Sequence, residues 1–598
     1  MAASTTLSPR VRAATSREAV VVGGLVVWSL ALLLLTWGRW GDLTMDTGYD
    51  LLAASRTAHG ELPYADYVYF YGPVGPFLLG GIYAITGPAL WPAVALGLAM
   101  AFATIALTYR LARVFVEPVP AALAAGLVAS AALGSANNSY VLPHTTSGPL
   151  ATALVLGAVL VLARWLRDGE QELRRPVIAG GLVGFVGVTR PEVALAVYVA
   201  IACWLAVRVW SAGAAGRGLA LRQGAALLAP AIVLPLMVYG AFLTVVSPHD
   251  LLWENLYPRD FVRAGGDVVL KAHAPLTALS FAKLAGHAVA YAAGLAALVG
   301  AGVAIERGGR LRTVVLAGAG LAVVAFLAVL VAKPDTVRFY LKWPYAWIPA
   351  GAALAVLVLV WRRRRAEAAS PAAEIALLLV LLMAGLTANT YAEFLPYPNA
   401  RFPAATAYLL PLAAVLLVAL HVRLAPRGRA GALLGVVWIG VLVVANAGLS
   451  VHDARQESQS VRGLHGTLGA HPAEASALRQ ALTVIARETR PGDPILLAPQ
   501  MSALYVMSGR RDPLPQLSLL PGALATAADE DRAIAQMDQL RLAITDRKPL
   551  DVYDQGAFGT SYDQRIAAWL KRKFRHAATL RGDGPDGRSL DIWIRRSP

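Results

Sequence analysis

Apolar runs recur along this chain from Val20 to Leu449. Each is about 20 residues long, the length that an α-helix needs to cross the hydrocarbon core of a bilayer. The runs are continuous, whereas the strands of a membrane barrel alternate apolar and polar residues over short segments. Only 15% of the residues are charged, against about 25% in soluble domains. The sequence therefore predicts an all-α polytopic membrane protein.

The distribution of basic residues predicts how the chain is threaded. Lys and Arg cluster at span ends, and placing these clusters on the cytoplasmic side makes the N-terminus cytoplasmic. The run 74–86 is too short for a span, and counting it as one would put the clusters 110–113 and 164–175 outside. We therefore expect it to be a half-buried or re-entrant helix. About 13 spans remain, at 20–36, 89–110, 119–136, 147–164, 176–189, 191–209, 222–246, 280–304, 312–332, 345–361, 372–389, 404–421 and 430–450.

The composition changes near Val451, where charges become frequent and apolar runs end. We predict a transmembrane domain at 1–450, with its first external loop at 39–88, and a small α/β domain outside the membrane at 451–598. The patterns predict strands at 494–499, 550–553 and 589–595 and helices at 527–545 and 561–575.

Several features concern the compartment and the partners. The single Cys203 excludes an internal disulfide, and no small-residue cleavage site follows the first apolar run, which predicts a retained span. The excess of Arg over Lys and the abundance of Ala and Gly are typical of a GC-rich bacterial genome, so we expect a multi-pass protein of a bacterial plasma membrane. The net charge of +16 lies at span ends and does not indicate nucleic acid. P-loop, dinucleotide and HExxH motifs are absent from the sequence.

The first external loop, which we call the opening segment (39–88), holds most of the candidate chemistry. It contains Asp46, Asp50, Glu61 and Asp66 among many tyrosines. Thr47 and Asp50 have the spacing of a helix start, and the helix should run to about His59 and end at Gly60. Asp46 would then lie at the positive end of a helix, which keeps a carboxylate ionised for service as a base or cation ligand. Alternatively, Asp46 only caps the helix and the tyrosines form an interfacial belt.

Other predicted external connections contain groups that can bind a phosphate or a sugar. Arginine offers a planar fork of donors to phosphate, although each such residue could equally contact solvent or lipid headgroups. Glu192 lies between two apolar runs, where a carboxylate needs a partner, and Arg190 is adjacent. With the opening segment, the candidate binding residues are Tyr49, Tyr64, Tyr71, Asn138, His144, Arg190, Glu192, Glu254, Arg259, Lys271, Arg338, Lys342 and Arg401.

One set of residues resembles a known family. Asp46, Gly48, Tyr49, Ala53, Gly60, Pro63, Tyr64, Asp66, Gly72 and Pro73 follow the pattern at the first external loop of GT-C fold membrane glycosyltransferases. The similarity is to the bacterial branch of glycosyltransferase family 39, the dolichyl-phosphate-mannose protein mannosyltransferases, and to the lipid A aminoarabinose transferase. The stretches 181–192 and 495–513 are also similar to that family.

The resemblance implies an inverting transfer of a sugar from a polyprenyl-phosphate donor to an acceptor outside the membrane. Asp46 would be the catalytic base, and Asp66 is the second candidate for a catalytic carboxylate. The acceptor would be a cell-envelope glycan, lipid or protein. Many relatives have an acid after the Asp, where this chain has Thr47. The sequence therefore leaves open whether a divalent cation assists the reaction and which residue is the second acid. No other cofactor is implied.

Two other classes of function remain open on the sequence. A transporter or lipid-linked sugar flippase would fit the many spans, although such proteins usually show repeats and ionisable residues at the membrane midplane. An oligosaccharide ligase or polymerase with a related fold would use a lipid pyrophosphate donor instead.

Overall fold

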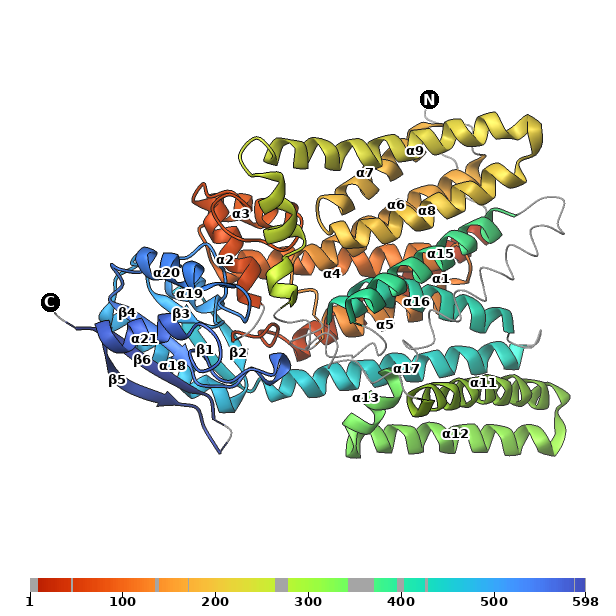
Figure 1. The fold of residues 1–598 in the computed structure, drawn as a ribbon. Helices are drawn as coiled ribbons and strands as arrows, with labels where there is room; N and C mark the ends of the chain where they lie inside the picture. Colours follow the sequence, from red (N-terminus) through yellow and green to blue (C-terminus); the bar gives the residue numbers. More distant parts are fainter. Residues whose placement is uncertain are drawn as a thin grey trace, which may run out of the picture.

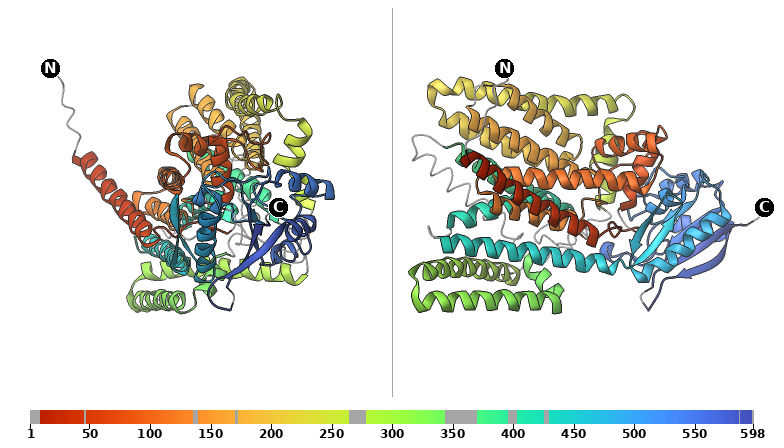
Figure 2. Two further views of the ribbon diagram at one scale, coloured as in Figure 1. Left: turned by 90° about the vertical axis from the view of Figure 1, so that its left-hand side faces the viewer. Right: turned by 180° about the vertical axis from the view of Figure 1, so that it is seen from behind.

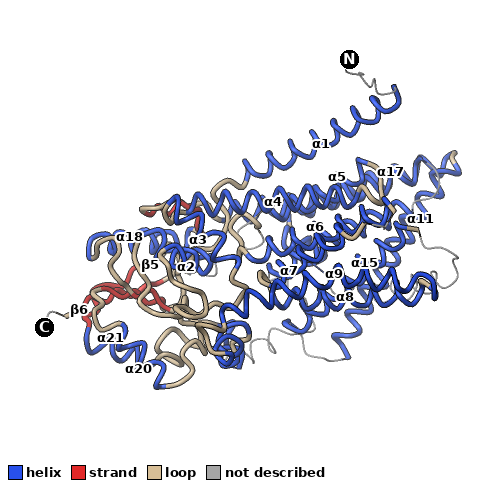
Figure 3. Tube along the Cα trace, turned by 90° about the horizontal axis from the view of Figure 1, so that it is seen from above, coloured by secondary structure: helices blue, strands red, loops and turns tan. Residues whose placement is uncertain are grey.

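The computed structural model describes residues 9–44, 47–134, 139–169, 172–263, 278–342, 370–394, 403–424, 429–585 and 587–596. It is mostly helical, with a small sheet domain at one end (Figure 1). The long helices lie roughly side by side. The strands lie together at one end of this group of helices (Figure 3).

The long apolar helices agree with the expected all-α membrane protein. Seven helices are long and apolar enough to cross a membrane among the described residues; the expected total of 13 is not confirmed, and the run 345–361 lies outside the described residues. The helices of the bundle are α1 (Pro9–Leu35), α4 (Leu90–Ala112), α5 (Pro118–Ala132), α6 (Ser147–Asp168), α7 (Arg174–Gly187), α8 (Pro191–Ser211), α9 (Gly213–Phe242), α11 (Ala278–Arg307), α12 (Gly309–Ala332), α15 (Pro371–Phe394), α16 (Pro403–Leu424) and α17 (Arg429–Gln456).

Four short helical elements lie between the long ones. They are α2 (Thr47–Ala58), α3 (Val74–Thr86), the π-helix η1 (Asp250–Leu256) and α13 (Pro334–Lys342). Helix α3 has the bounds expected for the short apolar run, is too short to span a bilayer, and packs against α2. Pro191 begins α8 after a break from α7, as the sequence predicts.

The C-terminal domain is built on a four-stranded sheet. Its order is β3 (Leu496–Ala498), β4 (Leu542–Asp546), β6 (Ser589–Arg595) and β5 (Phe574–Arg581); β3 and β4 are parallel and the other pairs antiparallel. A hairpin of β1 (Gln459–Gly463) and β2 (Gly466–Ala470) precedes it. The helical elements are α18 (Pro472–Glu488), α19 (Ala503–Ser508), α20 (Ala527–Gln536), η2 (Asp551–Tyr553) and α21 (Gln564–Lys573).

Three expectations for this domain need correction. The predicted helix 527–545 is only α20, because Gln536 ends it and 542–546 form the buried strand β4. Residues 550–553 form a 3₁₀ turn and not a strand, although Leu550 bridges Gln555. The predicted helix 561–575 is α21, whose last residues lead directly into β5, a strand that the sequence did not predict. The expected strands at 494–499 and 589–595 are confirmed as β3 and β6.

The C-terminal domain lies against the opening segment at one end of the bundle, which we call the loop end (Figures 1 and 2). The backbone N–H of Val68 donates to Pro515 O at 2.9 Å, and that of Gly469 donates at 2.7 Å to the O atom of Gly38, the residue just before the opening segment. A Cβ on Gly48 of α2 would lie 1.9 Å from Ala503 N of α19. This contact is therefore close enough to require a glycine.

Candidate functional site

The opening segment is fixed by a buried carboxylate. Asp50 lies in the first turn of α2 and is 5% exposed. Its Oδ1 accepts from Tyr69 Oη at 2.8 Å, and its Oδ2 accepts from Thr146 N at 2.5 Å. Burial raises the pKa of Asp50 above its ordinary value, against the opposing effect of these two hydrogen bonds. Asp50 was expected only to begin the helix; instead it joins the opening segment to the start of α6.

Aromatic side chains continue from this carboxylate across the opening segment. The rings of Tyr49 and Tyr69 stack with centroids 5.6 Å apart, and Tyr71 meets Tyr69 edge-on at 5.7 Å. The Tyr69 backbone N–H donates to Asn255 Oδ1 of η1 at 2.9 Å. Burial raises the pKa of Tyr49 and Tyr69 well above the ordinary value, so both hydroxyls stay protonated at neutral pH and act as hydrogen-bonding groups.

Tyr71 is the point at which three segments meet. Its hydroxyl lies 3.2 Å from His144 Nε2, just before α6, and its ring lies 4.4 Å below the Arg190 guanidinium, just before α8. Arg190 also donates to Thr145 Oγ1 at 3.1 Å and forms an ion pair with Glu192. The Arg190–Glu192 pair that the sequence predicted is therefore confirmed, and four candidate binding residues are brought together here.

The burial of this group defines what it can do. The side chain of Arg190 is 4% exposed and that of Glu192 28% exposed. A buried guanidinium held by a carboxylate, a hydroxyl and an aromatic face is pre-organised, so it can face an anion without losing side-chain freedom. The nearby hydroxyls and imidazole supply donors and acceptors of the kind that bind sugars or phosphates.

Two other tyrosine and carboxylate candidates lie elsewhere in the opening segment. Asp66 is exposed, and its Oδ2 accepts from Leu62 N at 2.7 Å, which closes a local turn. Tyr64 is buried with a φ of +71°, and its hydroxyl donates to Tyr71 O. Glu61 pairs with Arg56, and its side chain is 38% exposed.

Three further candidates do not contact the Tyr71 group in the described residues. Arg259 lies 3.5 Å from Asp260. Arg338 of α13 pairs with Asp453 of α17 and lies 3.8 Å from Asp335. Glu254 projects from η1. The remaining candidates Asp46, Asn138, Lys271 and Arg401 lie outside the described residues, as does the side chain of Lys342.

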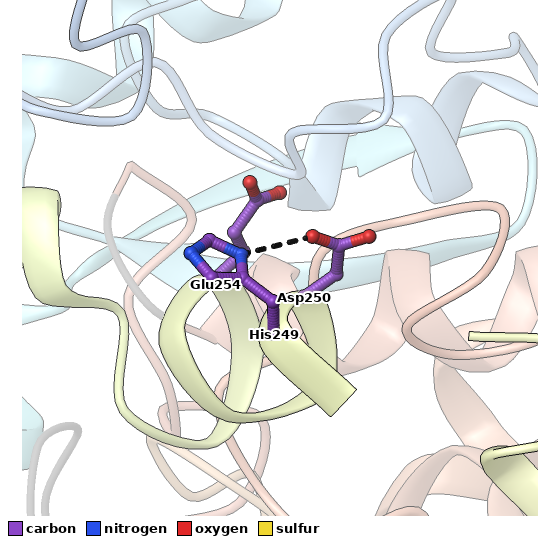
Figure 4. A group of neighbouring side chains, drawn as sticks. All are labelled: His249, Asp250 and Glu254. Atoms are coloured by element: carbon purple, nitrogen blue, oxygen red, sulfur yellow. Dashed lines mark hydrogen bonds and ion pairs between the residues drawn. The ribbon is translucent and has the colours of Figure 1, made fainter. Parts of the chain in front are cut away.

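One group of side chains has the composition of a cation site. His249, Asp250 and Glu254 offer ligand atoms that all lie within 4.8 Å of one another (Figure 4). Imidazole and carboxylate ligands suit zinc and other transition metals. Burial raises the pKa of Glu254, and neighbouring Asp250 adds to the shift. These three residues, all on or beside η1, are the described residues that could hold the divalent cation left open on the sequence.

Comparison with known proteins gives matches of fold only. No family model and no curated protein matches the chain. The oligosaccharyltransferase AglB from Archaeoglobus fulgidus, solved with an inhibitory peptide and a dolichol-phosphate, is 13% identical with a TM-score of 0.49, over 97% of this chain and 75% of that one. ArnT from Cupriavidus metallidurans, solved with undecaprenyl phosphate, is 12% identical with a TM-score of 0.47, over 96% and 97%.

At such identities and TM-scores the likeness assigns no activity to this chain.

Sequence reasoning missed several residues of the group. Asp50 was set aside, and Tyr69, Asn255, Thr145 and Thr146 were not singled out, although each contacts another part of the loop end. Their signal is tertiary, because Asn255 and Tyr69 are 186 residues apart in the chain. Only the alternation of the tyrosines at 67, 69 and 71 hinted that an extended segment places three rings on one side.

Proposed function

We propose that this protein is an inverting glycosyltransferase that moves a sugar from a polyprenyl-phosphate donor to an acceptor outside a bacterial plasma membrane. The observation that carries the proposal is the meeting of Tyr71, His144 and Arg190 at the loop end. It puts a buried cation and several hydrogen-bonding groups at the ends of apolar helices, beside the segment that resembles the family. In this orientation the N-terminus is cytoplasmic and the C-terminal domain is outside.

The proposed reaction needs a base and a stabilised leaving group. Asp46 takes the proton of the acceptor hydroxyl, whose oxygen attacks the anomeric carbon of the donor sugar. The bond from that carbon to the phosphate oxygen breaks, and polyprenyl phosphate leaves with the electron pair. Support for Asp46 comes from its position directly before Thr47, the first residue of α2, because a helix start favours an ionised carboxylate.

Arg190 is the proposed phosphate-facing cation. Its rigid setting between Glu192, Thr145 and Tyr71 limits reorganisation when charge develops on the leaving group. The acceptor would be a cell-envelope glycan, lipid or protein, reaching the same place from outside the membrane. The lipid tail would lie among the apolar helices. A donor sugar carried on a lipid phosphate does not require a nucleotide-binding site.

The test uses the full-length protein in nanodiscs. Polyprenyl lipids that co-purify are identified by mass spectrometry, and the identified polyprenyl-phosphate sugar is then supplied with envelope extract as acceptor. We expect release of polyprenyl phosphate with transfer of the sugar, and Asp46→Asn should reduce the rate by about 100-fold or more. The matched control is Asp583→Asn, an exposed carboxylate of the C-terminal domain, which should keep the normal rate.

Normal transfer by Asp46→Asn would rule out Asp46 as the base. Movement of the lipid across a membrane without any glycosyl product would favour a transporter or flippase, and turnover of only a pyrophosphate-linked donor would favour a ligase or polymerase.

A further inference from the structure

The end of the C-terminal sheet that points away from the opening segment is strongly cationic. Six exposed basic residues lie there: Arg541, Lys571, Arg572, Lys573, Arg575 and Arg596. We call this group the cationic end. Its members come from the start of β4, the end of α21, the start of β5 and the end of β6.

Backbone hydrogen bonds show that these residues are neighbours. Arg596 N donates to Lys573 O at 3.1 Å, and Arg595 N donates to Arg541 O at 2.9 Å. The Arg596 Nε also donates to Phe574 O at 3.1 Å. Three stretches that are separate in sequence, at the start of β4, at the junction of α21 and β5, and at the end of β6, therefore bring their positive charges to one end of the sheet.

The position of the cationic end separates it from the rest of the loop end. At the opposite end of the strands, β3 leads through Pro499–Met501 into α19, which contacts Gly48 of the opening segment. At the cationic end, β6 ends on the side of the domain that faces away from the helical bundle (Figure 1). The cationic end therefore lies on the far side of the domain from the apolar helices.

The charges at the cationic end lack the pairing found elsewhere in the domain. Arg532 and Arg565 pair with Asp529 and Asp531. Among the described residues, no carboxylate forms an ion pair with any of the six residues, and the nearby Asp538 pairs with Arg595. Like charges closer than the Debye length of about 8 Å repel one another at physiological salt.

Helix stabilisation accounts for only part of this charge. Lys571, Arg572 and Lys573 are in the last turn of α21, where cations interact favourably with the helix dipole. Arg541, Arg575 and Arg596 lie at strand ends, so the favourable interaction with the dipole of α21 does not account for their positions. A binding partner with regularly spaced negative charges would relieve the repulsion of the whole group.

We propose that the cationic end binds a polyanionic glycan of the cell envelope, a polymer that carries carboxylate or phosphodiester groups. Arginine forks suit both groups, and several separate contacts along one strand give useful affinity without a deep pocket. The C-terminal domain, which covers the opening segment, would then hold an acidic polymer on its outer end. The proposal uses the outward orientation of the domain but does not depend on glycosyl transfer.

The test is a binding measurement on the full-length protein in nanodiscs of zwitterionic lipid, without donor. The probes are polygalacturonate and neutral dextran of similar length. We expect binding of polygalacturonate, no binding of dextran, and an affinity that falls steeply with salt concentration, as for other linear polyanions. The variant Lys571→Glu/Arg572→Glu/Lys573→Glu should bind polygalacturonate about tenfold or more weakly.

A matched charge reversal distinguishes a local surface from net charge. Arg462→Glu/Lys548→Glu/Arg581→Glu changes three exposed cations elsewhere on the same domain and should bind within about twofold of the unaltered protein. Equal weakening of both variants, undiminished binding by the first variant, or absence of binding would overturn the proposal. Stronger binding to anionic vesicles than to polygalacturonate would also overturn it and assign the surface to membranes. Thermal unfolding of each variant shows whether the domain stays folded.

Discussion

At the loop end, the buried carboxylate of Asp50 joins two segments that are far apart in the sequence, although the sequence predicted for it only a place at a helix start. Asp50 satisfies a hydroxyl from the opening segment and a backbone N–H from the start of α6. A buried donor left without its acceptor costs about 1–3 kcal/mol. The role of Asp50 could not be inferred from its spacing, because acids in a first helical turn are common and their tertiary partners lie far away in sequence.

We predict that Asp50→Ala lowers the free energy of unfolding by about 2–4 kcal/mol, because it leaves both Tyr69 Oη and Thr146 N without an acceptor. Tyr69→Phe removes one hydrogen bond with its donor and should cost about 1 kcal/mol. Thermal unfolding in detergent compares the two variants. An equal effect of both would contradict the double role of Asp50.

The Tyr71 side chain offers a test that separates its hydroxyl from its ring. Tyr71→Phe loses the contact with His144 but keeps the face below Arg190, whereas Tyr71→Ala loses both. We predict that Tyr71→Ala weakens binding of polyprenyl phosphate about fivefold or more and that Tyr71→Phe changes it about twofold. Binding is followed by the lipid concentration needed for thermal stabilisation. Equal losses would show that the ring contact does not position Arg190.

At the scale of elements, the sequence predicted the long helices well and the short elements unevenly. Continuous apolar runs and basic ends marked α4 and α8 because a bilayer imposes both length and charge rules. The run 527–545 was wrongly predicted as one helix because Leu542–Asp546 is apolar enough for either a helix or a buried strand. Residues 542–546 form a strand because they pair with β3 and β6. A local sequence pattern does not show this pairing.

The contact between α2 and α19 gives a prediction at the same scale. Gly48→Ala should drive the opening segment and the C-terminal domain apart, because the added Cβ meets backbone atoms of Ser502 and Ala503. The control is Gly81→Ala in α3, where a Cβ meets nothing within 4 Å and alanine favours a helix by about 1 kcal/mol. Limited proteolysis should cut Gly48→Ala faster between the two parts and leave Gly81→Ala unchanged. Equal protection of both variants would contradict a close α2–α19 contact.

At the scale of the whole molecule, the two parts meet through polar as well as backbone contacts. Thr44 Oγ1 donates to Asp42 Oδ1 at 2.7 Å and lies 3.4 Å from Glu474 Oε2 of α18. Glu474 accepts from Arg588, which also pairs with the buried Asp546. The sequence predicted a separate outer domain, but it could not show that this domain covers the opening segment, since these partners are up to 430 residues apart.

Glu457, between α17 and β1, makes this junction sensitive to pH. Burial, with Asp42, Glu474 and Asp453 nearby, raises its pKa from 4.5 to about 7. The folded state therefore binds a proton that the unfolded state releases between pH 4.5 and 7, and stability falls as pH rises through this window. Above it, the folded protein carries the full cost of the buried charge.

Glu457→Gln should remove that cost. Because Glu457 is partly exposed, we expect a gain of about 1–2 kcal/mol in the free energy of unfolding at pH 8. No gain is expected at about pH 3, where Glu457 of the unaltered protein is protonated in both the folded and the unfolded state. Thermal unfolding of both proteins across this range measures the difference. Glu488→Gln, at the end of α18, is the control and should give no gain in the free energy of unfolding at pH 8, because it removes the ion pair with Arg487. A constant difference at all pH values would mean that the glutamine acts through packing rather than through the loss of a buried charge.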